Sequence, residues 1–154
     1  MCEKKHLYAA AASLYREAIA AKPDLVASPS NGVRYNAACA AALAGCGAGE
    51  DAARLTDAER ARLRKQALDW MRADHDAWRG LLDKDPAKAR PVVAELMQGW
   101  LRDGDFASVR GPDALANLPD AERKDWQKLW ADVAEALRRA GDRPPQAREV
   151  DKKP

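Results

Sequence analysis

The sequence predicts an all-α protein, and three observations support this prediction. Strong helix formers such as alanine, leucine, arginine, lysine and glutamate dominate the composition, whereas isoleucine and threonine are rare. Apolar residues recur every three or four positions along most of the chain, which is the period of an amphipathic helix. No segment shows the apolar–polar alternation of a β-strand. We therefore expect helices packed on helices.

The apolar periodicity divides the chain into about five helices within one helical domain, residues 1–141. The predicted helices span 3–21, 33–44, 57–83, 86–103 and 119–140. Pro23, Gly45, Gly104 and Gly141 stand where four of them stop, because proline cannot continue a helix and glycine favours the turn after one. Loops are expected at 24–32 and 46–55, with one helical turn near 113–116. Residues 142–154 are charged and proline-rich, which predicts a disordered and dispensable tail.

Individual residues sharpen two of these helix starts. Thr56 and Glu59 have the spacing of a capping box before the helix at 57–83. Asp85 followed by Pro86 predicts the start of the next helix, and Pro91 implies that this helix kinks or begins in earnest after it. The helix at 3–21 is expected to bury one broad stripe made of Leu7, Tyr8, Ala11, Leu14, Tyr15 and Ala18.

Charge and cysteine content exclude several classes of function. The chain has 26 lysines and arginines against 24 acids, a net charge of +2, so neither nucleic acid nor an anionic membrane is the expected partner. No run of 18 apolar residues predicts a transmembrane helix, and no signal peptide is visible. Three cysteines without Cys-x-x-Cys spacing favour a reducing, cytoplasmic setting with no disulfide, metal or other cofactor.

Residues 6–45 resemble a tetratricopeptide repeat (TPR). One helix of the repeat is matched by Tyr8, Ala11, Tyr15, Ala18 and Pro23, and the first helix of the next repeat by residues 34–45, RYNAACAAALAG. The resemblance implies antiparallel helical hairpins stacked as an irregular TPR-like solenoid. It also implies a module that binds a protein or peptide in a groove, with Asn36 facing that groove. Arg34, Arg60, Arg64 and Lys65 are candidate basic residues beside it, and the alternative is that Asn36 only caps or pairs locally.

Three segments together resemble the TPR-bearing C-terminal regions of planctomycete-type serine/threonine protein kinases. They are residues 34–45, residues 64–74 (RKQALDWMRAD) and residues 118–132 (LPDAERKDWQKLWAD). The resemblance implies a regulatory or docking tail that follows a kinase domain. It does not imply catalysis, because the chain has no glycine-rich phosphate loop and no His-Arg-Asp motif, and Asp105-Phe106-Ala107 lacks the glycine of Asp-Phe-Gly. We therefore expect no enzyme activity and no ATP binding.

The other chemically notable residues are expected to have structural roles. His75 and His6 lack a second metal ligand at helical spacing, and His75 is expected on a solvated helix face. Cys39 is expected in the core. Surface ion pairs are expected for the acids Glu59, Asp69, Asp74 and Asp76, each of which has a basic neighbour within four residues. Core packing is expected for the five tryptophans, Trp70, Trp78, Trp100, Trp126 and Trp130, since each lies on an apolar stripe.

Binding of a protein partner, or of an attached kinase domain, is the function that the sequence favours. Two alternatives stay open: a fragment of a longer kinase, and a free-standing scaffold that self-associates. The helix at 3–21 would leave apolar surface uncovered if a preceding helix is missing, and weak self-association through residues 7–19 is therefore expected.

Overall fold

A computed structural model describes residues 6–141, and this part of the chain is all-helical. Five long α-helices are present in it: α1 (Tyr8–Ala21), α2 (Val33–Gly45), α3 (Asp57–Lys84), α4 (Pro86–Arg102) and α6 (Asp120–Gly141). The remaining elements are short, namely the one-turn helix α5 (Pro112–Leu115) and the 3₁₀ turns η1 (Pro23–Val26), η2 (Pro29–Asn31), η3 (Asp51–Arg54) and η4 (Gly104–Val109). None of the described helices is long and apolar enough to cross a membrane. The tail predicted at 142–154 lies outside the described residues.

The capping geometry confirms the predicted starts of α3 and α4, whereas the first helix begins at Tyr8 and residues 6 and 7 before it are not helical. The Glu59 amide donates to the Thr56 hydroxyl at 3.2 Å, and the Thr56 amide donates to the Glu59 carboxylate at 2.7 Å, which completes the capping box. The Asp85 carboxylate accepts from the Lys88 amide at the start of α4. Helix α4 begins at Pro86 and continues through Pro91, so its start does not lie after the second proline.

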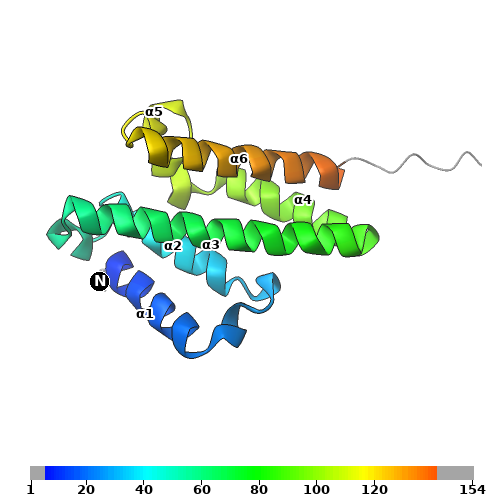
Figure 1. The fold of residues 1–154 in the computed structure, drawn as a ribbon, viewed down its shortest axis with the longest axis horizontal. Coiled ribbons are helices and arrows are strands. Elements are labelled where there is room, and N and C mark those ends of the chain that lie inside the picture. The colour runs from blue at the N-terminus through cyan, green and yellow to red at the C-terminus, as the bar shows by residue number, and fades with distance from the viewer. Residues whose placement is uncertain (1–5, 142–154) are drawn as a thin grey trace, which may run out of the picture.

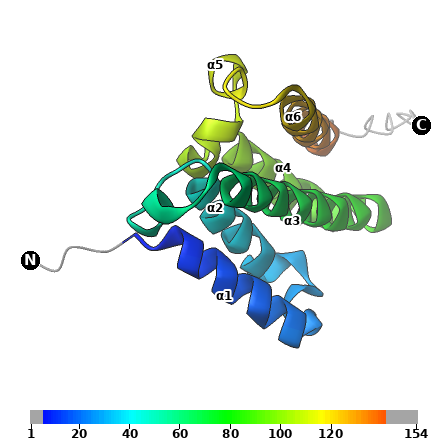
Figure 2. The same ribbon diagram turned by 60° about the vertical axis from the view of Figure 1, so that its left-hand side comes forward.

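Successive long helices run antiparallel, and α3 lies at the centre, where it contacts α2, α4 and α6 (Figure 1). Helix α2 lies between α1 and α3, while α4 packs mainly on α6 and both contact α3 (Figure 2). With 28 residues, α3 is about twice as long as the 13-residue α2, and it therefore spans both groups of helices. The described chain is thus built of antiparallel hairpins that share one long helix.

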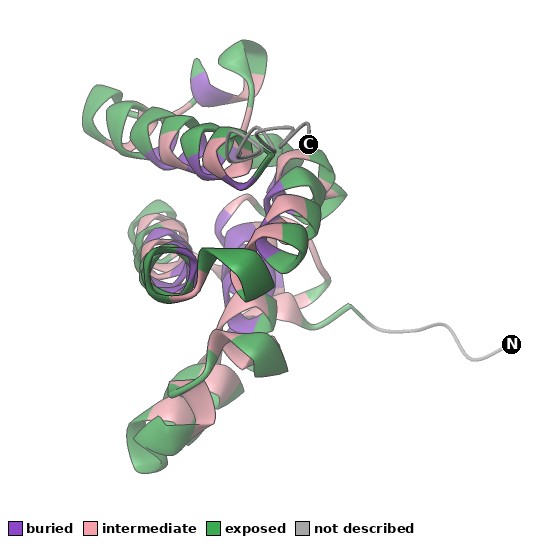
Figure 3. Cartoon of the chain, turned by 90° about the vertical axis from the view of Figure 1, so that its right-hand side faces the viewer, coloured by how far each residue is buried: buried purple, intermediate pink, exposed green. Residues whose placement is uncertain are grey.

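Small residues let α2 occupy the centre of the protein. Its buried residues include six alanines: Ala37, Ala38, Ala40, Ala41, Ala42 and Ala44. At its end, a Cβ added to Gly45 would lie 2.7 Å from the Arg64 side chain and 2.9 Å from the Arg60 carbonyl oxygen, so only glycine fits. Figure 3 shows this helix as the most completely buried part of the fold.

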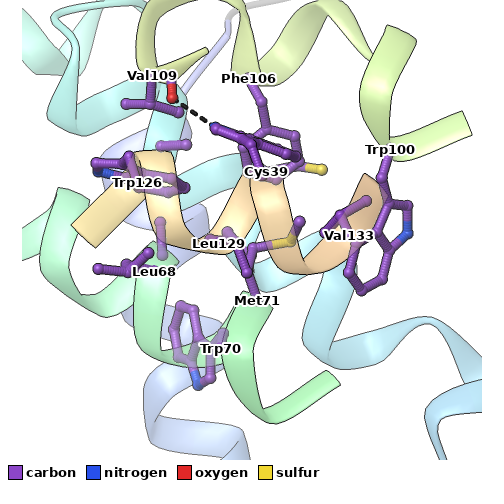
Figure 4. Packing of buried hydrophobic residues seen from close by; sticks show 14 of the residues in the cluster. Cys39, Leu68, Trp70, Met71, Trp100, Phe106, Val109, Trp126, Leu129 and Val133 are labelled. Carbon is purple, nitrogen blue, oxygen red and sulfur yellow. Dashed lines mark hydrogen bonds between the residues drawn. The ribbon is translucent and has the colours of Figure 1, made fainter. Parts of the chain in front are cut away.

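The tryptophans lie in the core, as predicted. All five are at most 8% exposed. Phe106 packs edge-on against Trp130, whose indole N–H donates to the buried Val109 carbonyl oxygen at 2.7 Å (Figure 4). Trp126 stacks on Trp130 one turn away on α6. These contacts join α6 to η4.

The stripe predicted for the first helix is partly wrong. Leu14 is 67% exposed and Leu7 is 44% exposed. The packed face of α1 instead consists of the buried Ala12 with the half-buried Tyr8, Ala11, Tyr15 and Ile19. The reason is that α1 packs chiefly on α2, and a single neighbour covers only one narrow face of a helix.

Candidate functional site

The structure does not gather the five predicted site residues on one surface. Arg60 and Arg64 line one small cavity of about 340 Å³ together with Cys46, at the end of α2. Lys65 lies outside it and pairs with Asp69, one turn away on the exposed side of α3.

Three of the predicted basic residues hold parts of the fold together. Arg64 donates to both carboxylate oxygens of Glu122 on α6, at 2.8 and 3.0 Å, and to the Gly45 carbonyl oxygen at 2.8 Å. Arg60 donates to the Ala52 carbonyl oxygen of η3. Arg34 contacts both the Val26 carbonyl oxygen and the Asp74 carboxylate. Asn36, on α2, and Lys65, on α3, are the predicted residues whose side chains are exposed and therefore accessible to a partner.

A larger groove opens between α3, α4 and the start of α2. Its volume is about 750 Å³, and we call it the α3–α4 groove. It is lined chiefly by Tyr35, Asp74, Trp78, Val92, Glu95, Leu96, Gly99, Trp100, Arg102 and Asp103, with Pro29, Ser30 and Gly32 at one end. The walls that α3 and α4 contribute are therefore mostly apolar, and charged side chains interrupt them.

The floor of the groove is rigid and aromatic. Tyr35 stacks on Trp100, with ring centroids 5.3 Å apart and planes 19° apart. The Tyr35 hydroxyl donates to the Asp103 carboxylate at 2.5 Å. Burial and this hydrogen bond raise the pKa of the Tyr35 hydroxyl, so it stays protonated and keeps donating. The stack and the hydrogen bond together fix the α2 side of the groove to the end of α4.

Asp74 lies at the bottom of the groove and is a buried acid. Its side chain is 2% exposed, and one carboxylate oxygen is 3.4 Å from the guanidinium of Arg34. Arg34 also donates to the Val26 carbonyl oxygen at 2.7 Å, so it ties the 24–32 segment to α3. Burial raises the pKa of Asp74 from its usual 3.8 to about 6, although the positive charge of Arg34 acts in the opposite direction.

The expectation of solvated side chains at Asp74 and His75 is wrong. His75 is 5% exposed, and its Nε2 lies 3.2 Å from the Asp132 carbonyl oxygen of α6. Helix α3 is covered on more than one side, by α2, α4 and α6, so two adjacent residues are both buried. A signal for Asp74 was present in the sequence, because it follows Ala67, Trp70 and Met71 at helical spacing on the apolar stripe.

A polar cluster borders the groove next to Tyr35. The Cys39 thiol and the carboxylates of Asp103 and Asp105 offer ligand atoms within 4.8 Å of one another. Burial raises the pKa of the Cys39 thiol, and the two carboxylates add to this effect. Asp103 also accepts from the Asp105 amide at 2.9 Å, which caps η4. The cluster therefore forms a hydrogen-bonded corner between α2 and η4.

Several groove residues contributed by α4 are ones that sequence reasoning missed. Glu95, Leu96 and Gly99 are unremarkable in the sequence, and only the crossing of α3 and α4 brings them opposite Trp78. Comparison with known proteins does not assign the chain: no family model matches it, and no curated protein or solved structure matches it either.

Proposed function

We propose that this chain is a non-catalytic binding module whose α3–α4 groove takes a segment of another protein. The observation that carries the proposal is the groove itself, an open, mostly apolar surface with a rigid aromatic floor. Val92 on its rim is 44% exposed, although it is a large aliphatic residue. Apolar side chains of a partner would bury such surface, and this burial is the usual source of affinity in peptide grooves.

The resemblance to TPR proteins supports the same class of function. We propose that α1, α2 and α3 correspond to TPR-like helices and that the module docks a serine/threonine kinase, either an attached kinase domain or a separate one. Asn36 is exposed on α2, the helix that also contributes Tyr35 to the groove. A cytoplasmic setting fits the free thiols of Cys39 and Cys46 in the described part of the chain, because a reducing compartment keeps thiols free.

The proposal is tested by selecting peptides on the wild-type protein and then measuring their binding to a variant in which the groove is filled. Gly99 lies in α4 on the groove wall, and a Cβ added there meets nothing within 4 Å. We therefore expect Gly99→Trp to fill part of the groove, because its Cβ meets no neighbour. The change also removes a glycine from a helix interior, which costs no helix propensity. Gly80→Trp is the matched control, since Gly80 is an equally open glycine on α3 outside the groove.

A phage-displayed library of random peptides would be selected on the wild-type protein. We expect recovered peptides to bind the wild type and Gly80→Trp equally and to lose at least tenfold in affinity for Gly99→Trp. Recovery of no peptides, or of peptides that bind Gly99→Trp as well as the wild type, would contradict the proposal.

Self-association is a second candidate function, and the exposed face of α1 favours it. Leu7 and Leu14 lie seven residues apart, on one side of the helix and away from its packed face. Sedimentation velocity of the purified chain at increasing concentration tests this candidate. A species that stays monomeric at all concentrations would remove it.

A further inference from the structure

The charges around the α3–α4 groove are unequal. Three of its charged lining residues, Asp74, Glu95 and Asp103, are acids, and Arg102 is the base among them. Arg102 lies in the last turn of α4, where the negative end of the helix dipole partly compensates a positive charge. Because Asp74 is buried and paired with Arg34, the acids left for a partner are the exposed Glu95 and the half-buried Asp103, with Arg102 as the exposed base.

Two of these acids form no side-chain ion pair in the described residues, although the Arg110 guanidinium donates to the backbone carbonyl oxygen of Asp103 at 2.8 Å. Asp74 is paired with Arg34, but within residues 6–141 neither Glu95 nor Asp103 forms an ion pair. Glu95 lies in α4, and Asp103, eight residues later and about 12 Å along the helix axis, is the C-cap residue that follows the last turn of this helix. Leu96, Gly99 and Trp100 lie between them and line the groove. Along α4 and its C-cap the groove lining thus reads acid, apolar, base, acid, with the base Arg102 next to Asp103.

We infer that the occupant of the α3–α4 groove is a peptide segment that carries a lysine or arginine next to its apolar anchors. This inference rests on the proposed function. The aliphatic stem of such a residue covers the apolar wall of the groove, and its charged end reaches the carboxylate of Glu95. An acidic segment would instead face Glu95 and Asp103 with a like charge.

The first test is the composition of the peptides selected on the wild-type protein and depleted on Gly99→Trp. We expect lysine or arginine within a few residues of leucine, phenylalanine or tryptophan in the recovered sequences. If groove-dependent peptides are recovered that are acidic or uncharged, this inference is overturned while the proposed function stands. If no groove-dependent peptide is recovered, both fail together.

The second test assigns the contact to Glu95. A recovered peptide and its form with the basic residue changed to glutamine would be titrated into wild type and Glu95→Gln. We expect each single change to weaken binding about twofold to fivefold, as for an exposed ion pair. The double change should cost little more than either single change, because both remove the same contact.

Gln98→Lys is the matched control for this cycle. Gln98 is exposed on α4 and does not line the groove, and the substitution changes the charge by the same single unit as Glu95→Gln. Gln98→Lys should weaken the binding of the basic peptide and of its glutamine form by similar factors. Equal coupling for Gln98→Lys and Glu95→Gln, or no coupling for Glu95→Gln, would show that the basic residue does not contact Glu95.

Discussion

Replacing Asp74 with asparagine tests whether burial in the groove makes the ionised form of this acid destabilising. The side chain is 2% exposed, and burial raises its pKa to about 6 from the usual 3.8. Between these two pH values the folded protein binds a proton at Asp74 that the unfolded chain does not bind. The stability that this proton confers is therefore fully present below about pH 3.8 and is lost as the pH rises through 6.

The size of the effect follows from the shift. A change of one pKa unit corresponds to about 1.4 kcal/mol, so a shift from 3.8 to about 6 corresponds to about 3 kcal/mol. Asparagine has the shape of the protonated acid but does not ionise. The free energy of unfolding of Asp74→Asn minus that of the wild type should therefore rise by about 3 kcal/mol between acidic pH and pH 8, and level off above about pH 7.

Urea unfolding of both proteins at several pH values measures this difference, and other titrating groups cancel in it. Asp69→Asn is the control, because Asp69 is on the same helix but is exposed and pairs with Lys65. The opposite result would be a free energy of unfolding that rises with pH in the wild type relative to Asp74→Asn. The ionised Asp74 would then be net stabilising through Arg34, and the assignment of burial as the dominant effect would be refuted.

Four further predictions follow from single features of the fold. Trp130→Phe removes the donor to the buried Val109 carbonyl oxygen and should lower the free energy of unfolding in urea by about 1–3 kcal/mol, whereas a loss below about 0.5 kcal/mol would mean that water replaces the indole. Thr56→Ala should cost about 1 kcal/mol by the same assay and Thr56→Ser much less, and equal losses would show that the hydroxyl does not cap α3. Leu14→Asp should change stability by less than about 0.5 kcal/mol, since Leu14 is 67% exposed, and a loss above about 2 kcal/mol would place it in a covered interface. A chain ending at Gly141 should melt within about 5 °C of the full chain in calorimetry, and a larger drop would show that residues 142–154 pack on the domain.

The sequence was most informative about where helices begin and end. Thr56 with Glu59, and Asp85 with Pro86, are local signals, and the structure places the starts of α3 and α4 at these residues. The buried face of α1 was harder to predict, because tyrosines and alanines surround this helix on several sides. Which of its faces packs depends on the position of α2, and no local rule contains that information.

The candidate site was predicted only in part, for a similar reason. Arginines were read as groove residues on the basis of charge, yet Arg34 and Arg64 make specific contacts with Asp74 and Glu122 from distant parts of the chain. Ion pairs over such sequence separations cannot be read from spacing along one helix. Asp74 is different, because its place on an apolar stripe already indicated burial. The stacking of TPR-like repeats likewise remains a prediction.

The most direct test of the central claim is to follow the five tryptophan indole N–H signals by NMR while a groove-selected peptide is added. Trp78 and Trp100 line the α3–α4 groove, whereas Trp126 and Trp130 are residues of α6 that lie in the core next to η4. Assignment would come from single tryptophan-to-phenylalanine variants. Saturable shifts of the Trp78 and Trp100 signals, with the Trp126 and Trp130 signals unchanged, are the result that the groove predicts. Shifts confined to the other tryptophans, or no shift at a peptide concentration that saturates binding, would contradict it.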